Sequence, residues 1–336
     1  MTAGWKTGHI RTDNPAGRGT ERFAFHEATT DHDAMKRRQQ GILTGMPFMA
    51  NIAIRTFVDD LGRKIYLAKP PHRIVSLAPS VTEILYAVGA ADRLVAVTQF
   101  CDYPPDAALK PKIGGTKPGI ESLEALKADL ILTPRAFVDP GLIDKLDQLK
   151  ITTYVMETKT VEDVLSHVHT VGRILDQSVA ATQLVSDLRR RIQRVKERTA
   201  GLSKPRLLYV LNHDPLMTVG PGSFIHHLIE LACAENIGAA TGQAYPRMSM
   251  EDVLKQDPEV LVFPVGVSEG ICPEQQQSWQ RWRDMSAGGS RRFYQIERVL
   301  MDRPGPRIVE GLERLAALLH ADAFPDVSLS SGPPSP

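Results

Sequence analysis

The sequence predicts an α/β fold with two similar lobes, because one helix–strand pattern occurs twice. Residues 121–134 read ESLEALKADLILTP, and residues 251–264 read EDVLKQDPEVLVFP. In both segments, apolar residues at helical spacing lead through a polar break into a short apolar run that is typical of a buried strand. A duplicated unit of this kind indicates two lobes with a ligand cleft between them.

The first half of the chain alternates strand-like and helical patterns. Residues 56–67 predict a hairpin that turns near Gly62. After it, the alternation favours a parallel sheet, so we assign residues 55–159 to an N-terminal α/β lobe. The predicted strands are 74–77, 95–98, 130–133 and 153–156, and the predicted helices are 81–88, 120–126 and 141–149.

A change of pattern separates this lobe from the second one. Residues 160–200 have apolar residues at helical spacing, no proline and a single glycine before position 200, Gly172. The pattern predicts one long helix of about 60 Å, at about 1.5 Å per residue, which links the lobes rigidly. The second lobe, residues 204–322, repeats the alternation. Its predicted strands are 207–211, 260–264 and 299–301, and its last helix is 308–319.

Both ends of the chain differ from these lobes. Residues 1–34 are polar and without periodicity, and we expect residues 1–54 to be a disordered extension, or one translated from a start codon upstream of the natural one. A basic stretch begins at Met35, but the apolar run after it is interrupted, which leaves no clear signal peptide. Residues 323–336 are rich in Ser, Pro and Gly, which predicts a disordered tail.

Composition excludes several classes of function. Forty Lys and Arg residues stand against 39 Asp and Glu residues, and the resulting net charge of +1 disfavours nucleic-acid binding. Cys101, Cys233 and Cys272 lack CxxC spacing, so they support neither a disulfide framework nor a zinc site. The sequence also lacks HExxH and GxSxG motifs, so these two hydrolase signatures are absent.

Candidate site residues lie where predicted strands end, since ligands bind at this edge of an open α/β sheet. Glu83 begins a helix and either stabilises its first turn or contacts a ligand. Phe100 and Tyr103 follow the second strand, where they either cover the core or face the cleft. Arg303 and Arg307 flank a Pro-Gly-Pro turn, where they bind ligand oxygens or remain solvated.

Several of these segments together resemble the periplasmic substrate-binding proteins of cobalamin and iron-siderophore ABC importers. The motifs are RIVSLAPSVTE at 73–83, DYPP at 102–105, Glu121 with LKAD at 126–129, and RPGPR at 303–307. The likeness covers about residues 55–322, and the DYPP and PGP phrases are most similar to the corrinoid branch. It implies two Rossmann-like lobes, joined by one rigid helix, in a protein that acts as a monomer.

The resemblance also implies a function without catalysis and without a cofactor other than the ligand. The chain would capture cobalamin or a related corrinoid in the cleft and deliver it to an ABC permease dimer with cytoplasmic ATPase subunits. Glu121 and Glu251, one on each lobe, would dock onto arginines of the permease, which sets orientation more than affinity. The expected ligand contacts are Phe100, Tyr103, Met217, Tyr245, Asp302 and Arg303. Gly115 and Pro134 stand where the best-known corrinoid binder has tryptophans.

Other functions stay open at this point. Heme or a ferric siderophore is the nearest alternative ligand in the same family. A tetrapyrrole metal chelatase of similar shape is the alternative from another class, with His213 and Asp214 as its candidate proton acceptor and carboxylate. The resemblance implies a periplasmic or cell-surface location, while a cytoplasmic one stays open without a clear signal peptide.

Overall fold

The computed structural model describes residues 54–115, 117–138, 140–266, 271–279, 285–290 and 292–327. These residues belong to one compact unit, Ala53–Pro336. The expected extension before residue 54 and the tail after residue 327 lie outside the described residues, and Phe324, within the expected tail, is buried against the core. The domain limits drawn from the sequence stay predictions.

A four-stranded parallel sheet forms the first lobe, as the alternating pattern predicts. Its strand order is β4-β3-β5-β6, with β3 Ile74–Ser76, β4 Leu94–Val97, β5 Leu130–Pro134 and β6 Thr153–Met156. Most of their side chains are buried, as expected for a parallel sheet covered on both faces. The helices between the strands are α2 Pro79–Ala87, α3 Pro105–Ala108, α4 Ile120–Ala125 and α5 Pro140–Gln148.

The predicted hairpin precedes this sheet. Strand β1, Arg55–Val58, pairs antiparallel with β2, Lys64–Leu67. Gly62 in the connecting turn has a φ of +78°, a conformation that glycine adopts without steric cost.

The second sheet repeats the strand order of the first. Its order is β10-β9-β7-β8, with β7 Arg206–Tyr209, β8 Glu235–Asn236, β9 Val260–Val265 and β10 Phe293–Glu297. The duplicated sequence unit is α4 with β5 in one lobe and α9, Met250–Gln256, with β9 in the other. The other helices are α8 Phe224–Leu231, α10 Pro273–Trp279, α11 Ser286–Ser290, α12 Arg298–Met301 and α13 Ile308–Leu319.

The prediction of a last strand at 299–301 is wrong. These residues lie in α12, and the strand is β10, just before it. A short apolar run does not distinguish a strand from a buried helical turn, and Leu300 and Met301 are buried on the helix. Strand β10 is an edge strand with only one buried residue, Ile296, so its apolar pattern is weak.

The prediction of a single helix over residues 160–200 is also wrong. The segment forms α6, Val161–Ile174, and α7, Ser178–Thr199, joined by a tight corner in which Asp176 has a φ of +56°. Gly172 lets the two helices approach, because a Cβ at this position would lie 2.2 Å from the Cβ of Ala181. The glycine therefore permits a sharp reversal of the chain, which the continuous helical pattern concealed.

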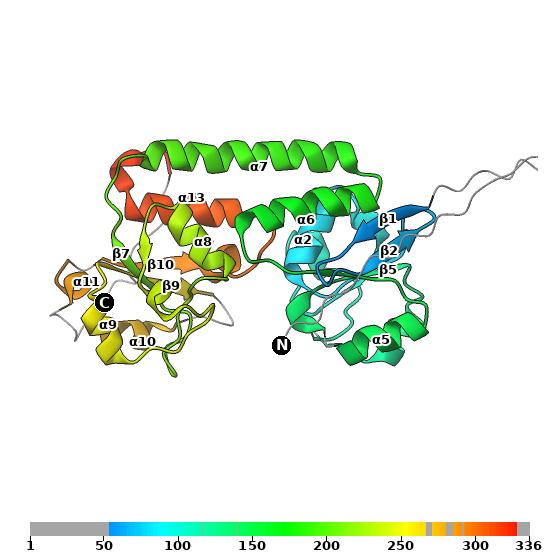
Figure 1. Cartoon of the computed structure of the whole chain (residues 1–336), viewed down its shortest axis with the longest axis horizontal. Helices are drawn as coiled ribbons and strands as arrows, with labels where there is room; N and C mark the ends of the chain where they lie inside the picture. The colour runs from blue at the N-terminus through cyan, green and yellow to red at the C-terminus, as the bar shows by residue number, and fades with distance from the viewer. Residues whose placement is uncertain are drawn as a thin grey trace, which may run out of the picture. The chain divides into compact units, whose positions relative to one another are not determined.

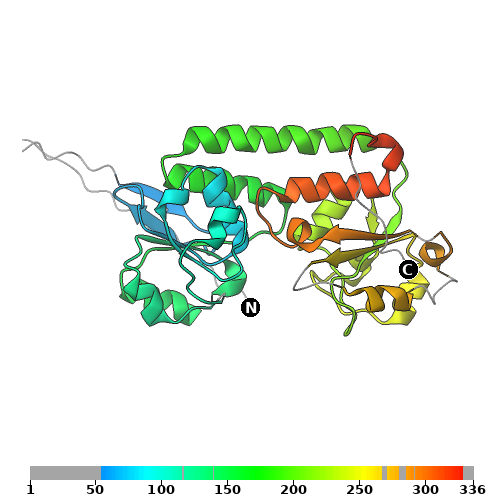
Figure 2. The same ribbon diagram turned by 180° about the vertical axis from the view of Figure 1, so that it is seen from behind.

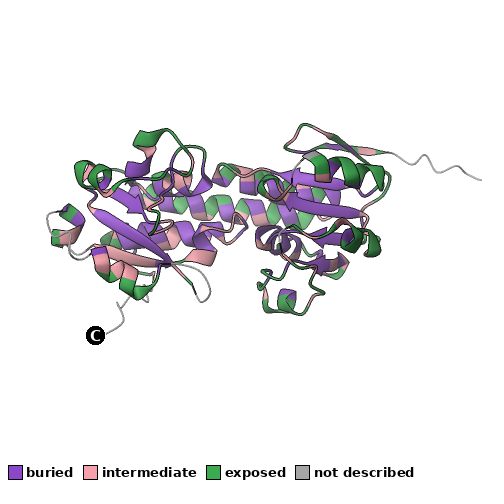
Figure 3. Cartoon of the chain, turned by 90° about the horizontal axis from the view of Figure 1, so that it is seen from below, coloured by how far each residue is buried: buried purple, intermediate pink, exposed green. Residues whose placement is uncertain are grey.

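Helix α7 is the element that lies along both lobes. It runs beside α6 of the first lobe and α13 of the second, as both views show (Figures 1 and 2). A hydrophobic cluster continues through these helices from the first sheet to the second. In Figure 3, most strand residues of both sheets are buried, the edge strand β10 is largely intermediate, and exposed residues lie on the outer faces of the helices. The lobes thus share one apolar layer on the side of α7.

Candidate functional site

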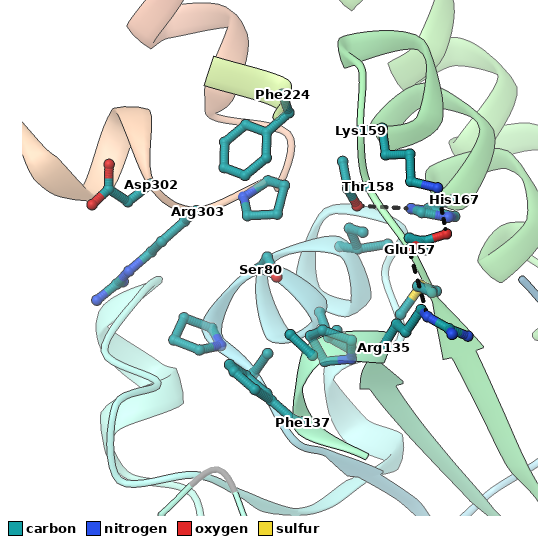
Figure 4. Close-up of a pocket in the computed structure, with 18 of the residues that line it drawn as sticks. Ser80, Arg135, Phe137, Glu157, Thr158, Lys159, His167, Phe224, Asp302 and Arg303 are labelled. Atoms are coloured by element: carbon teal, nitrogen blue, oxygen red, sulfur yellow. Dashed lines mark hydrogen bonds and ion pairs between the residues drawn. The ribbon is translucent and has the colours of Figure 1, made fainter. Parts of the chain in front are cut away.

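A pocket of about 600 Å³ lies between the two lobes. The first lobe lines it with the start of α2 and with residues that follow β5 and β6, and the second lobe with the start of α8, Tyr245 and residues 302–304 (Figure 4). Strands β3, β5 and β6 are parallel, so these segments come together at the carboxyl edge of the first sheet.

Aromatic rings and prolines form much of the pocket wall. Phe137 comes from the first lobe and Phe224 from the second, on opposite sides of the pocket (Figure 4). Pro79, Pro134, Pro304 and Tyr245 add further flat or apolar surface. Burial, with a smaller contribution from Asp302, raises the pKa of Tyr245, so its hydroxyl keeps its proton at neutral pH.

A cluster of charged side chains occupies the end of the pocket formed by the first lobe (Figure 4). Glu157 pairs with Lys159 at 2.9 Å and with Arg135 at 3.5 Å. His167 Nε2 lies 2.8 Å from Asp60 Oδ2. Burial acts to raise the pKa of Asp60, but the hydrogen bonds from His167 and from the backbone of Glu157, together with the charge of Lys159, outweigh it, so this pKa is lowered. Arg135 and Lys159 thus both contact Glu157, and Asp60 contacts His167, so each of these charged groups has a partner within the protein.

Asp302 marks the opposite end of the pocket. The hydroxyl of Tyr209 donates to Asp302 Oδ1 at 2.9 Å, and Arg298 Nε lies 2.7 Å from Oδ2. Tyr209 is buried, and burial raises its pKa well above the ordinary value, so the hydroxyl remains a donor. Both oxygens of Asp302 thus have partners within the protein.

Two arginines of the second lobe form ion pairs with carboxylates of the first. Arg307 donates to both oxygens of Glu83, at 3.0 and 2.6 Å. Arg303 donates to both oxygens of Asp102, at 2.5 and 3.1 Å. Bidentate pairs of this kind fix geometry as well as charge. The loop that carries both arginines is thereby held against the first lobe.

Burial acts in opposite directions on the pKa values of Glu83 and Arg307, the more buried of these two ion pairs. It raises the pKa of Glu83, although Arg307 acts against this shift. Burial acts to lower the pKa of Arg307, but the hydrogen bonds and charge of Glu83 outweigh it, so the pKa is raised. The two-point contact of Arg307 indicates an ionised carboxylate at neutral pH.

The structure brings half of the predicted ligand contacts together. Tyr245, Asp302 and Arg303 line the pocket. Phe100, Tyr103 and Met217 are not among its lining residues. Tyr103 instead lies below Arg307, whose guanidinium carbon is 3.7 Å from the ring centroid. The ligand contacts themselves stay predictions for all six residues.

Several lining residues were not identified from the sequence. Arg135 and Phe137 directly follow β5, and Glu157 directly follows β6. The rule that sites lie at strand ends, applied to these two strands, would have found them. His167 gave no such signal, because it lies on the buried face of α6 and reaches the pocket only through tertiary packing.

The two predicted docking glutamates occupy equivalent positions. Glu121 is the second residue of α4, Glu251 is the second residue of α9, and both are exposed. The next five residues have the same burial pattern in both copies, 122–126 and 252–256. The duplication therefore extends to the exposure of these carboxylates, and their role in docking stays a prediction.

The described part of the chain contains no candidate metal site and no candidate membrane-spanning helix. No cluster of three or more His, Cys, Asp or Glu side chains there could hold a metal ion. The three cysteines are free thiols. None of the described helices is long and apolar enough to span a bilayer.

The fold and the pocket define a two-lobed binding protein, and comparison with known proteins gives its family. Residues 74–299 match the family described as "Periplasmic binding protein", and the chain belongs to it. It is a substrate-binding protein of the ABC-transporter type, which confirms the family resemblance and the α/β two-lobed fold class. This class serves transport and is not a class of enzymes.

Individual relatives make the comparison more specific. The vitamin B12-binding protein of Vibrio cholerae is 31% identical over 258 residues, which is 75% of this chain and 91% of the relative. The crystal structure of the periplasmic vitamin B12 binding protein of the same species has a TM-score of 0.67 at 29% identity, covering 76% of this chain and 98% of the other.

Two other relatives show the range of the fold. An uncharacterized ABC transporter substrate-binding lipoprotein of Bacillus subtilis is 28% identical over 277 residues, which is 80% of this chain and 86% of the relative. A periplasmic heme-binding protein of Roseiflexus sp. RS-1 has a TM-score of 0.66 at 20% identity over 75% of this chain and 99% of the other, a likeness of fold alone. Proteins of this family are thus periplasmic or lipoprotein-anchored.

Proposed function

We propose that the chain captures a corrinoid, with cobalamin as the expected cargo, in the pocket between its lobes. It then delivers the corrinoid to an ABC permease dimer that is driven by cytoplasmic ATPase subunits. The similarity to vitamin B12-binding proteins over most of the chain supports this assignment. The pocket wall supports it as well, because aromatic rings bury a large apolar area at small entropic cost and suit the flat face of a corrin.

We base the choice of ligand on the pairing of charged side chains in the pocket. Each charged side chain of its lining contacts an opposite charge or a hydrogen-bonding partner within the protein. A carboxylate-bearing ligand such as heme, or an anionic siderophore, gains most from arginines that are not already paired. Corrinoids with amide side chains need only neutral donors and acceptors, so this pocket favours them over heme and ferric siderophores.

The proposal is tested by removing aromatic surface from the pocket. Tyr245→Ala and Phe137→Ala should weaken the binding of cyanocobalamin by about tenfold to a hundredfold, because covering an aromatic side chain with the ligand contributes about 1.5–3 kcal/mol. Tyr66→Ala is the matched control, since Tyr66 is an exposed aromatic residue on the hairpin and lies outside the pocket lining. Titration calorimetry measures the three affinities. Unchanged binding by both pocket variants would place the ligand elsewhere.

The chelatase alternative finds little support at the pocket. Its candidate base, His213, lies with Nδ1 3.3 Å from the Trp279 indole nitrogen, which donates to it. Neither His213 nor Asp214 is among the residues that line the pocket. A metal insertion assay with a porphyrin or sirohydrochlorin tests this alternative: activity that His213→Ala abolishes would favour the enzyme.

The partners follow from the same proposal. A permease that receives the corrinoid would contact the exposed carboxylates of Glu121 and Glu251, at equivalent places on the two lobes. The binding protein would act as a monomer, in the periplasm or at the cell surface, where a family member meets its transporter. The small-molecule ligand and the transporter are the expected partners, and nucleic acid is not.

A further inference from the structure

Asp102 lies outside the pocket lining, but its negative charge compensates the positive charge of Arg303, which lines the pocket. It belongs to the loop after β4 in the first lobe, and its side chain is 60% exposed. Both of its oxygens accept hydrogen bonds from Arg303, which the second lobe supplies to the pocket. These hydrogen bonds lower the pKa of Asp102, so its carboxylate is ionised at neutral pH.

Arg303 is therefore a pocket arginine whose charge is already compensated. Its Nη1 also lies 3.9 Å from the buried Glu83, which Arg307 holds by two hydrogen bonds. The set contains two arginines and two carboxylates and carries no net charge at neutral pH. In Figure 4, Arg303 lies on the opposite side of the pocket from Arg135, Glu157 and Lys159, which form a separate cluster.

The pairing has different consequences for charged and neutral ligands. A ligand carboxylate beside Arg303 would meet the negative charge of Asp102 at close range, and would have to displace it to use both guanidinium nitrogens. A carbonyl or amide oxygen carries no charge to be repelled. It can accept one of the guanidinium hydrogens that Asp102 leaves free, because a guanidinium has five and Asp102 takes two.

We propose that Asp102 is a specificity-determining residue: by compensating the charge of Arg303, it makes the pocket select chelates with uncharged amide side chains over chelates with free carboxylates. This inference rests on the proposed corrinoid function and refines it. Asp102 acts through Arg303 and from outside the pocket lining, so its removal should change the preference between ligands more than the affinity for the neutral one.

The test compares two ligands that differ by one charge. Cyanocobalamin is titrated beside its monocarboxylic acids, in which one peripheral propionamide has been hydrolysed. The wild-type protein should bind the amide form more tightly. In Asp102→Asn, the ratio of the two dissociation constants should fall about tenfold for at least one isomer, which corresponds to about 1.4 kcal/mol. Asp102→Glu keeps the charge and should keep the wild-type ratio.

Asp106→Asn is the matched control. Asp106 is an exposed carboxylate in the first turn of α3, four residues from Asp102, and it lies outside the ion pairs with Arg303 and Arg307. The substitution removes one negative charge, as Asp102→Asn does, but should leave the ratio unchanged. An equal ratio in wild type, Asp102→Asn and Asp106→Asn would overturn the role of Asp102 while the corrinoid function stands.

A second pair of ligands separates the two proposals. If the wild-type protein binds no corrinoid, the proposed function fails, and hemin is compared with its diamide, in which both propionates are amidated. A rise in hemin affinity relative to the diamide in Asp102→Asn would still support the role of Asp102. An unchanged ratio, or no binding of any of these probes, would overturn it.

Discussion

At the scale of single residues, Glu83 shows how burial turns an ordinary helix residue into part of an inter-lobe contact. It is the fifth residue of α2, beyond the first turn, and the sequence indicated either helix stabilisation or a ligand contact for it. The structure gives it a third role, because its side chain is 2% exposed and pairs with Arg307 of the other lobe. The partner lies 224 positions away, so no local pattern could have predicted it.

Removing Arg307, the partner of Glu83, should lower the stability of the protein. Arg307→Ala leaves a buried carboxylate without its bidentate counter-charge, and we expect the free energy of unfolding to fall by about 3–5 kcal/mol. Urea denaturation measures the change. Adding Glu83→Gln to this variant removes the uncompensated charge and should restore part of the loss.

The matched control is Arg314→Ala, whose arginine is 35% exposed and pairs with Glu297 and Glu310. Surface pairs of this kind contribute about 0–1 kcal/mol. A loss in Arg307→Ala no greater than that in Arg314→Ala would contradict the importance of the Glu83 pair.

His227 should make the contact between the lobes sensitive to pH. Its Nδ1 accepts a hydrogen bond from the backbone N–H of Val161 at 3.0 Å, which requires a neutral ring. Burial lowers the pKa of His227 below the ordinary value of 6.5. The unfolded chain therefore binds a proton more readily, so this residue's contribution is present above pH 6.5 and is lost as pH falls through the lowered folded pKa.

His227→Asn keeps an acceptor near the Nδ1 position but cannot titrate. From pH 7.5 to 5, the wild-type protein should lose more stability than this variant, measured by urea denaturation at each pH. His169→Asn is the control, since His169 is exposed on α6 and should leave the wild-type pH dependence intact. Parallel pH profiles for wild type and His227→Asn would refute the assignment.

At the scale of elements, the strands and helices with strong local patterns could be predicted, and those set by tertiary contacts could not. The hairpin, the parallel strands β3 to β6 and helix α13 follow from clear periodicity. The corner between α6 and α7 was missed, because the apolar stripe continues across it and only the packing of Gly172 against Ala181 reveals it. Strand β10 was missed because an edge strand has a weak pattern.

Gly172 offers a direct test of this corner. Alanine favours a helix over glycine by about 1 kcal/mol, so Gly172→Ala would stabilise an isolated α6. The added Cβ would lie 2.2 Å from the Cβ of Ala181 and 3.2 Å from the Gln177 carbonyl oxygen. We therefore expect a net destabilisation of about 1–3 kcal/mol, measured by thermal or urea unfolding.

The double variant Gly172→Ala with Ala181→Gly moves the methyl group to the other helix and should recover part of the loss. Gly172→Ala with wild-type or higher stability would indicate that α6 and α7 are not closely packed at this point.

At the scale of the whole molecule, the duplication places equivalent carboxylates on both lobes. Glu121→Ala and Glu251→Ala should leave corrinoid affinity unchanged, because both residues lie outside the pocket lining. They should reduce ligand-stimulated ATPase activity of the reconstituted transporter, and the double variant should reduce it most. Glu124→Ala, an exposed carboxylate on the same helix α4, is the control. Full ATPase stimulation by the double variant would remove these glutamates from docking.

At the site, some pocket residues could be predicted from the sequence, whereas the ion pairs between the lobes could not. The family resemblance pointed to six ligand contacts. Tyr245, Asp302 and Arg303 line the pocket, whereas Phe100, Tyr103 and Met217 do not. The charge balance that favours a neutral ligand depends on pairs such as Arg303 with Asp102, which are 201 positions apart. Ion pairs across lobes form only once both lobes are packed together, so the sequence alone could not predict them.

The central claim is that the pocket captures a corrinoid, and parallel calorimetric titrations of the full chain test it most directly. Cyanocobalamin, hemin and a ferric siderophore are each added to the wild-type protein. We predict a dissociation constant below about 1 μM, or a binding free energy stronger than about −8.2 kcal/mol, for cyanocobalamin alone. Binding of hemin or the siderophore without cyanocobalamin would contradict the corrinoid assignment while keeping the transport class, and no binding of any of the three would contradict the account of the pocket itself.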